Sequence, residues 1–194
     1  MSSYNGSGEV IEVVQPDSVR DPLPPDDNRD GDGVDARSAR WIRRHMAGGV
    51  SVITTVHGAL FRGTTVSACI AASIDPFQML VSIEEDSQME EWIRRSGVFA
   101  FNLLPWNEQF LADQFAGFTP VASGTFRGIP HFVGSTGAPI LEACMAWVEC
   151  RVVASLQTGD HICFVGEAVG VGSGKGSIDD PLIYFFNRYH RLRQ

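Results

Sequence analysis

The sequence has few cysteines, no pairing pattern among them, and no long hydrophobic run. Four cysteines stand at positions 69, 144, 150 and 163, none in a Cys-x-x-Cys pair and each within an apolar stretch. Cysteines in this setting are typically small buried side chains that stay reduced, as in a reducing compartment. No apolar run approaches the roughly 18 residues that a membrane helix needs, and no basic-then-apolar signal segment stands at the start. We therefore expect a soluble, cytoplasmic protein.

Positive charge is also scarce. The net charge is −8, but residues 1–35 hold nine acidic residues and two arginines, whereas residues 36–194 hold fourteen acidic and thirteen basic residues. The acidity therefore belongs to the N-terminal segment. The nearly neutral remainder offers no basic stripe to a phosphate backbone, so we expect no nucleic-acid partner.

The composition predicts one globular domain after a tail. Residues 1–35 are polar and rich in Pro, Asp and Gly, too poor in apolar area to offset the entropy of ordering, so we expect a disordered acidic extension there and one domain over 36–194. The run 26–32 resembles a calcium loop, but Arg37 stands where a bidentate glutamate is required. The five histidines are scattered, so no metal site is predicted.

Apolar periodicity predicts a mainly β chain with short helices. Helices are expected over 36–47, 87–95 and 107–116, the second with Ser87 as its N-cap. Strands are expected over 50–56, 60–72, 79–83, 98–104, 145–156, 161–171 and 182–186, with an excursion or loop at 117–140 and a basic helix end or tail after 187. Strands linked mostly as hairpins favour an antiparallel barrel, and the helix–strand alternation of a doubly wound sheet is absent.

One glycine-rich segment imitates a phosphate loop. The segment 170–177 has the right composition, but Val169 stands where the first glycine is needed and Gly176 follows Lys175 where Ser or Thr is required. We interpret it as a flexible loop. No dinucleotide site of the Rossmann kind is expected either.

Four motifs in order along the chain carry a resemblance to a known family. They are Gly63-Thr64-Thr65-Val66-Ser67-Ala68, Ser73-Ile74-Asp75-Pro76, Phe99-Ala100-Phe101-Asn102 and Gly159-Asp160-His161. Together they resemble the flavin reductase-like family over about residues 38–192. The resemblance implies a homodimeric antiparallel split β-barrel that passes a hydride from NADH or NADPH to FMN or FAD. It also implies that reduced flavin is supplied to a partner monooxygenase.

The resemblance assigns flavin contacts to two stretches. The ring would lie against Thr64, Thr65, Val66, Ser67 and Ala68, because short hydroxyl side chains and backbone groups at a strand edge suit its polar rim and apolar face. Ser73 and Ile74 belong to the turn that borders the ribityl chain, although Phe77 replaces the second proline of the family motif.

Further positions follow from the same resemblance. Ser87 is expected near the flavin phosphate, where the first amides of a helix suit an anion; as a plain N-cap it would look the same. Phe101 and Asn102 match a family strand, with Asn102 bonding either the flavin or a neighbouring loop. Tyr189 belongs to a closing aromatic and basic segment, which is either near the flavin or simply the chain end.

His161 is the expected catalytic residue, because an imidazole at the mouth of a strand can bond a nicotinamide carboxamide. A half-exposed strand histidine is the plainer interpretation. Asp160, also assigned to the cofactor site, is expected mainly to shape the turn.

Two other functions remain open. One is an oxidase or oxygenase component of the same fold acting on an organic substrate, and the other is a non-catalytic flavin-binding module whose acidic tail recruits a partner. The sequence does not distinguish FMN from FAD or identify the oxygenase. No arginine cluster marks a 2′-phosphate site, which mildly favours NADH over NADPH.

Overall fold

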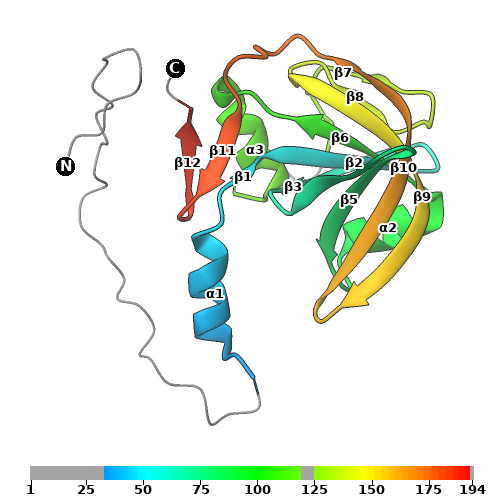
Figure 1. Ribbon diagram of the computed structural model, residues 1–194. Helices are drawn as coiled ribbons and strands as arrows, with labels where there is room; N and C mark the ends of the chain where they lie inside the picture. Colours follow the sequence, from blue (N-terminus) through cyan, green and yellow to red (C-terminus); the bar gives the residue numbers. More distant parts are fainter. Residues whose placement is uncertain (1–32, 119–124, 193–194) are drawn as a thin grey trace. The chain divides into compact units, whose positions relative to one another are not determined.

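The computed structural model describes residues 33–118 and 125–192 (Figure 1). The chain divides between Arg43 and Arg44 into two compact units. The first contains most of helix α1 (Ala36–Arg44), whose start is capped by the Asp35 carboxylate, which accepts hydrogen bonds from the backbone N–H groups of Arg37 and Ser38. The calcium-like run and nearly all of the expected acidic extension lie outside the described residues.

The second unit is mainly β with short helices, as the sequence predicts. Its strands are β1 (Gly48–Gly49), β2 (Ser51–His57), β3 (Leu60–Val66), β4 (Cys69–Ile74), β5 (Phe77–Glu84), β6 (Val98–Leu103), β7 (His131–Val133), β8 (Pro139–Leu141), β9 (Ala146–Thr158), β10 (His161–Ser173), β11 (Leu182–Phe185) and β12 (Arg188–Arg191). Its helices are α2 (Gln88–Ser96) and α3 (Gln109–Phe115), the latter preceded by the 3₁₀ turn η1 (Trp106–Glu108). None of the described helices is long and apolar enough to cross a membrane.

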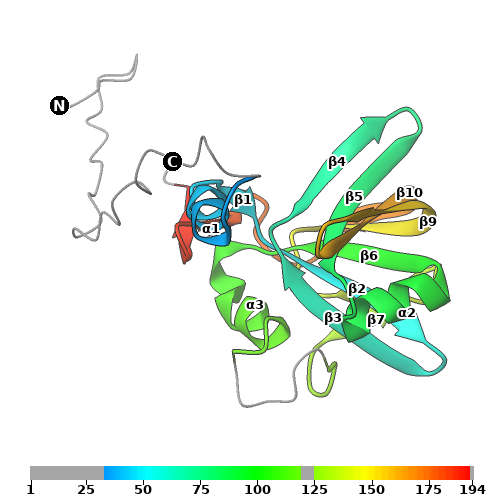
Figure 2. The same cartoon turned by 90° about the horizontal axis from the view of Figure 1, so that it is seen from below.

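Seven strands form one antiparallel sheet in the order β3-β2-β6-β9-β10-β5-β4. Residues 51–55 of β2 are all buried, which explains why that segment is nearly continuous in apolar and β-branched residues: both of its faces are covered. β3 and β4 are the two edges of the sheet, and Figure 2 shows β4 and β5 as a hairpin that extends away from β2 and β3.

The sequence predicts a single strand over 60–72, and this is wrong. The chain breaks at Ser67 and Ala68, both exposed, because β3 pairs with β2 whereas β4 pairs with β5. The break thus takes the chain from one edge of the sheet directly to the other. Local periodicity is nearly unchanged across it, so only the pairing partners reveal it.

Two smaller sheets were not expected. The basic segment 188–191, predicted to end a helix or form a tail, is strand β12, which pairs with β11 in the sheet β1-β11-β12. The excursion at 117–140 contains β7, which pairs with β8. Both strands are too short for periodicity to indicate them, and β12 carries two arginines that stay exposed.

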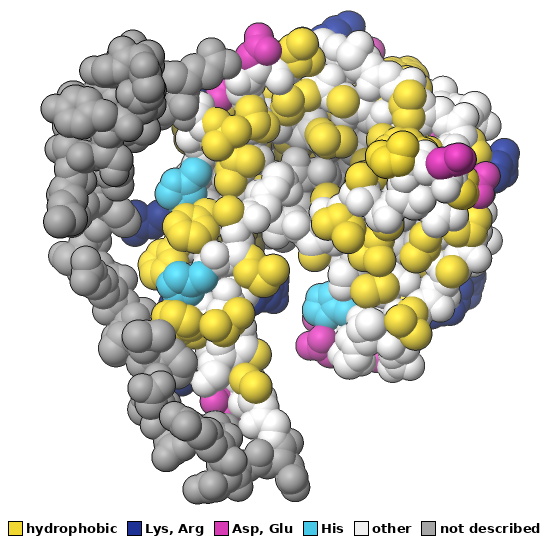
Figure 3. All heavy atoms as spheres, viewed as in Figure 1, with side chains coloured by type: hydrophobic (Ala, Val, Ile, Leu, Met, Phe, Trp, Pro, Cys, Tyr) yellow, Lys and Arg dark blue, Asp and Glu magenta, His cyan; other side chains and the backbone are white. Residues whose placement is uncertain are grey.

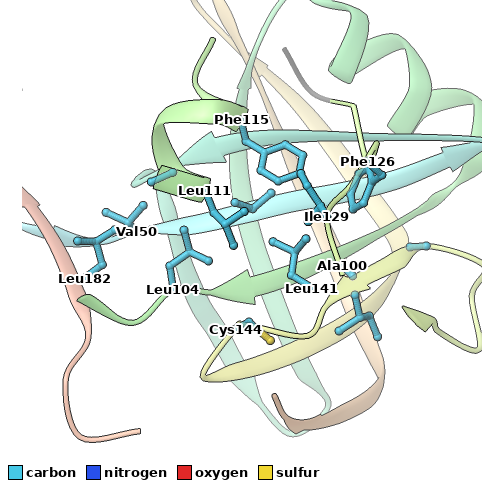
Figure 4. Packing of buried hydrophobic residues seen from close by; sticks show 14 residues of the cluster. Val50, Ala100, Leu104, Leu111, Phe115, Phe126, Ile129, Leu141, Cys144 and Leu182 are labelled. Carbon is cyan, nitrogen blue, oxygen red and sulfur yellow. The ribbon is translucent and has the colours of Figure 1, made fainter. Parts of the chain in front are cut away.

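The core consists of two clusters on opposite faces of the large sheet. Successive strand residues belong to different clusters, because their side chains alternate between the two faces. On β2, Val52 belongs to the first cluster and Ile53 to the second; on β6, Ala100 belongs to the first and Phe101 to the second. In the first cluster, Leu111 and Phe115 project from α3 toward the strands (Figure 4). The second is closed by Met89 and Ile93 of α2.

Candidate functional site

An open cavity of about 290 Å³ lies where β3 passes the first turn of α2. It is lined by three consecutive residues of β3, the first three positions around the start of α2 and one aromatic side chain of α3: Arg62, Gly63, Thr64, Ser87, Gln88, Met89 and Phe115. Its volume approaches that of pockets that hold small ligands. Two residues that the sequence assigns to the flavin, Thr64 and Ser87, therefore meet in one place.

The start of α2 is set by Ser87, as the sequence predicts. The Ser87 backbone is extended, and its Oγ accepts a hydrogen bond from the backbone N–H of Glu90, 3.2 Å away. The first amides of a helix lack partners inside the helix, and together with the helix dipole they favour an anion. The cavity therefore has a helix start on one wall and the Arg62 cation on the other.

The first turn of α2 also contains two carboxylates that would oppose an anion. Each is paired with an arginine one turn later: Glu90 Oε1 lies 2.6 Å from Arg94 Nη2, and Glu91 Oε1 lies 2.7 Å from Arg95 Nη2. These ion pairs at i,i+4 spacing offset the negative charge near the cavity. Their contribution to stability is small, because the arginines are largely exposed.

β3 is held against α3 by one small residue and one hydroxyl. A Cβ placed on Gly63 would lie 2.7 Å from Cε1 of Phe115, so only glycine lets this ring pack against the strand. Thr65 Oγ1 donates to the carbonyl of Ala112 at 2.7 Å. The side chain of Thr65 is therefore engaged by the protein, while Thr64, on the other face of β3, lines the cavity.

The remaining residues of the predicted ring site follow Thr64 toward the edge of the sheet. Val66 is half-buried against the second core cluster, and Ser67 and Ala68 are exposed at the crossing from β3 to β4. On β4, Ser73 is half-buried and Ile74 is exposed. The stretch from Thr64 to Ala68 thus runs from the cavity to an accessible sheet edge made of small residues.

His161 begins β10 immediately after the turn that joins it to β9. Gly159 adopts a left-handed φ of +64°, which glycine takes without strain. His161 Nδ1 lies 2.7 Å from Oδ1 of Asp160, and the imidazole is about one-third exposed. The Asp160 carboxylate, which the sequence predicts mainly to shape the turn, thus also orients the His161 imidazole through this contact.

The turn that carries His161 is attached to the loop that leads into α2. The backbone N–H of Glu85 donates to the carbonyl of Asp160 at 3.0 Å, and Gln157 Nε2 donates to Glu85 Oε1 at 2.8 Å. Glu85 lies two residues before Ser87. The predicted nicotinamide residue and the predicted phosphate residue are therefore connected through a single short loop.

Two predicted contacts, Phe101 and Asn102, lie in the core instead. Both are fully buried. Asn102 Nδ2 donates to the carbonyl of Val52 at 3.0 Å and to Thr54 Oγ1 at 3.2 Å, while its Oδ1 accepts from the backbone N–H of Leu141 at 2.7 Å. The amide joins β2, β6 and β8, so of the two roles that the sequence leaves open, the structure gives Asn102 the bond to a neighbouring segment.

Tyr189 lies on β12 and does not line the cavity. Its Oη donates to Oδ1 of Asp113 on α3 at 2.9 Å, and its ring packs against Tyr184. Burial, the hydrogen bond to Asp113 and the charge of that carboxylate together raise the pKa of the Tyr189 phenol. The phenol therefore stays protonated and fastens the small sheet to α3.

Sequence reasoning assigned no flavin contact to five of the seven cavity residues, although Gly63 opens one of the four motifs. Arg62 shares its strand face with Thr64, and Gln88 and Met89 follow the N-cap, so strand alternation and helix position both contain a signal for them. Phe115 carries no such signal, because only the packing of α3 brings it to β3. Among the described residues, no group of three or more His, Cys, Asp or Glu side chains is placed to hold a metal ion.

Comparisons with known proteins identify the family of the chain. The family model described as "Flavin reductase like domain" matches residues 43–193. A protein of Kitasatospora aureofaciens named "Flavin reductase (NADH)" is 35% identical over 81% of this chain and 82% of its own length. The reductase component of a 4-nitrophenol 4-monooxygenase/4-nitrocatechol 2-monooxygenase of Rhodococcus opacus is 31% identical over 80% of both chains. The solved structure of the flavin reductase PheA2 superposes with a TM-score of 0.75 at 32% identity, covering 83% of this chain and all of that one.

Proposed function

The chain belongs to the flavin reductase-like family, and from this premise we propose that it is an NADH:flavin oxidoreductase. The two cofactors supply the chemistry, in which a hydride moves from nicotinamide C4 to flavin N5 while NADH becomes NAD⁺ and the flavin gains one proton from solvent. Similarity to a flavin reductase named for NADH supports this donor. The observation that carries the proposal is that Thr64 and Ser87, which lie in separate segments of the sequence, line one cavity together with a cation.

The residues of the cavity suit the phosphate end of a flavin. Arg62 supplies a positive charge, Ser87 a hydroxyl, and the start of α2 the amides that favour an anion. A doubly charged phosphomonoester fits this combination better than a neutral ligand does. We assign Arg62 and Ser87 to phosphate binding, with Thr64 between the phosphate and the ring.

The strand residues that follow the cavity along the sheet edge suit the ring system of the flavin. Thr64 to Ala68 and Ser73 present small side chains and backbone groups, which let a flat ring approach closely. Thr65 and Val66 take part through their backbone, because their side chains face the protein. Ile74 offers exposed apolar area beside them. Phe101 and Asn102 act by keeping β2, β6 and β8 in place.

His161 is assigned to the nicotinamide. With its Nδ1 hydrogen directed at Asp160, the imidazole keeps Nε2 as an acceptor for a carboxamide N–H group. Asp160 is therefore a positioning residue. No side chain needs to act as acid or base for a hydride transfer, so the protein holds the two rings together and excludes water.

We further propose that the curled seven-stranded sheet is a split β-barrel and that two copies associate. Ile70, Leu80, Val165 and Ala154 stand side by side across four strands on the outer face. Ile70 is 59% exposed, and Figure 3 shows hydrophobic side chains over the visible surface of β5, β9 and β10. An apolar row across four strands is unusual on a monomer. Val165→Lys is expected to shift the sedimentation coefficient to that of a single copy.

Two broader assignments complete the proposal. By similarity to a monooxygenase reductase component, the reduced flavin is delivered to a separate oxygenase. The four cysteines are free, which supports a reducing compartment, the cytoplasm. We keep 36–194 as the reductase domain and 1–35 as its acidic extension.

The test is anaerobic mixing of the protein with NADH and either FMN or FAD. Loss of the flavin visible absorbance, with a rate proportional to protein concentration, is expected. Flavin binding without NADH oxidation would identify a non-catalytic module. Oxidation that requires an added organic substrate would instead identify an oxidase or oxygenase component.

A further inference from the structure

A cationic and aromatic cluster borders the cavity on the side away from the sheet edge. The guanidinium carbon of Arg62 lies 5.5 Å from the centroid of the Trp92 ring on α2. The Trp92 ring also contacts the imidazole of His57, with centroids 5.5 Å apart. Trp92 and His57 are partly exposed. Arg62 belongs both to the cavity and to this cluster.

The cluster continues the line of the cavity. Arg62 and Thr64 lie two residues apart on one face of β3, which separates them by roughly 7 Å. On α2, Trp92 follows Gln88 by one helical turn, or about 6 Å along the axis. Figure 2 shows α2 beside β2 and β3, and contacts between these elements agree. Both elements therefore lead from the phosphate end of the cavity to the indole.

We propose that Arg62 and Trp92 bind the adenylate half of FAD, so that this protein binds FAD more tightly than FMN. This proposal rests on the flavin reductase function proposed above. A base stacks on tryptophan and on the guanidinium plane of arginine, and the same guanidinium can neutralise the second phosphate of FAD. FMN ends at its phosphate and gains nothing from the indole.

The position of the cluster matches the length of the ligand. The first phosphate of FAD occupies the Arg62, Thr64 and Ser87 end of the cavity. The second phosphate and the ribose then span about one strand repeat or one helical turn, which is the spacing from Thr64 to Arg62 and from Gln88 to Trp92. The adenine reaches the exposed part of the indole.

Equilibrium binding of FMN and FAD to the flavin-free protein tests the proposal. For the wild type, FAD is expected to bind about tenfold more tightly than FMN. This ratio lies toward the lower end of the affinity gain for one base stacked on an aromatic ring. Trp92→Ala is expected to remove this preference, and Trp92→Phe to retain most of it. The matched control is Phe110→Ala, which removes an exposed aromatic side chain of α3 and is expected to keep the wild-type ratio.

Three results would overturn the proposal. Equal affinities for FMN and FAD in the wild type would do so without any variant. A Trp92→Ala protein that loses both affinities equally would show that the indole only supports the fold. A tenfold rise in the NADH Michaelis constant with FMN as acceptor, at an unchanged FAD-to-FMN ratio, would assign the cluster to the adenine of NADH. If neither flavin binds the wild type, the reductase function itself fails.

Discussion

Replacing Glu149 by glutamine is expected to destabilise the protein in a pH-dependent way. Glu149 is 3% exposed on β9 and accepts four hydrogen bonds. The backbone N–H and hydroxyl of Ser135 lie 3.1 Å from Oε2, and those of Thr136 lie 2.8 and 2.7 Å from Oε1. The carboxylate thus fixes the segment that connects β7 to β8.

The magnitude follows from the acceptors that are lost. Glutamine keeps one carbonyl oxygen for two of the four donors, and its NH₂ group cannot accept from the other two. A donor left without its charged acceptor costs about 1–3 kcal/mol, so Glu149→Gln is expected to lower the free energy of unfolding by roughly 2–4 kcal/mol at pH 7. Glu142→Gln, at the surface ion pair with Lys175, is the matched control and is expected to cost less than about 1 kcal/mol.

The pH dependence has a definite sign. Burial raises the pKa of Glu149, but the hydrogen bonds from Thr136 and Ser135 outweigh it, and the pKa is held below its ordinary value. The stabilisation is therefore complete above the pKa of the unfolded chain and is lost as the pH falls through the lower pKa of the folded protein.

Urea unfolding of the wild type and both variants measures this effect. The assay is run at pH 7 and at the lowest pH where all three remain folded. The Glu149→Gln penalty should shrink at the acidic pH, because the wild-type carboxyl group becomes protonated there. A penalty below about 0.5 kcal/mol at pH 7, the scale of an ordinary surface substitution, or one that is equal at both pH values, would refute the reasoning.

The remaining predictions concern the site and its support. Gly63→Ala forces a methyl group into the Phe115 ring and is expected to cost about 1–3 kcal/mol in thermal unfolding and to weaken flavin binding; unchanged affinity and melting temperature would contradict the packing. His161→Ala should raise the NADH Michaelis constant more than the flavin constant in steady-state kinetics, and an unchanged NADH dependence removes His161 from the site. Asn102→Leu leaves the Leu141 N–H unpaired and should lower urea stability by roughly 2–4 kcal/mol, whereas an effect on flavin binding alone would return Asn102 to the flavin.

The sequence indicates local features of the site better than its assembly. Ser87 with Glu90 three residues later predicts the N-cap that the structure confirms, because that bond joins residues close in sequence. The turn at Gly159 is likewise local. The cavity itself depends on α2 and α3 packing beside β3, and no sequence pattern states which helix meets which strand.

The burial of Phe101 and Asn102 has a physical explanation. A motif strand with Phe101 and Asn102 looks the same whether its side chains face a ligand or the interior. Burial decides between these roles, and it depends on β2 and β8, whose residues lie far away in sequence. The break at Ser67 is hidden for a related reason, because a change of sheet partner leaves the strand composition unchanged.

The central claim is that the cavity between β3 and α2 holds the phosphate of a flavin. The most direct measurement compares the dissociation constants of FMN and riboflavin, which differ only by that phosphate, for the wild type and for Arg62→Met. The wild type is expected to prefer FMN by more than about tenfold, since a single charge-assisted hydrogen bond contributes about 1.5–3 kcal/mol, and Arg62→Met is expected to lose most of that preference. Equal affinity of the wild type for FMN and riboflavin would contradict the account.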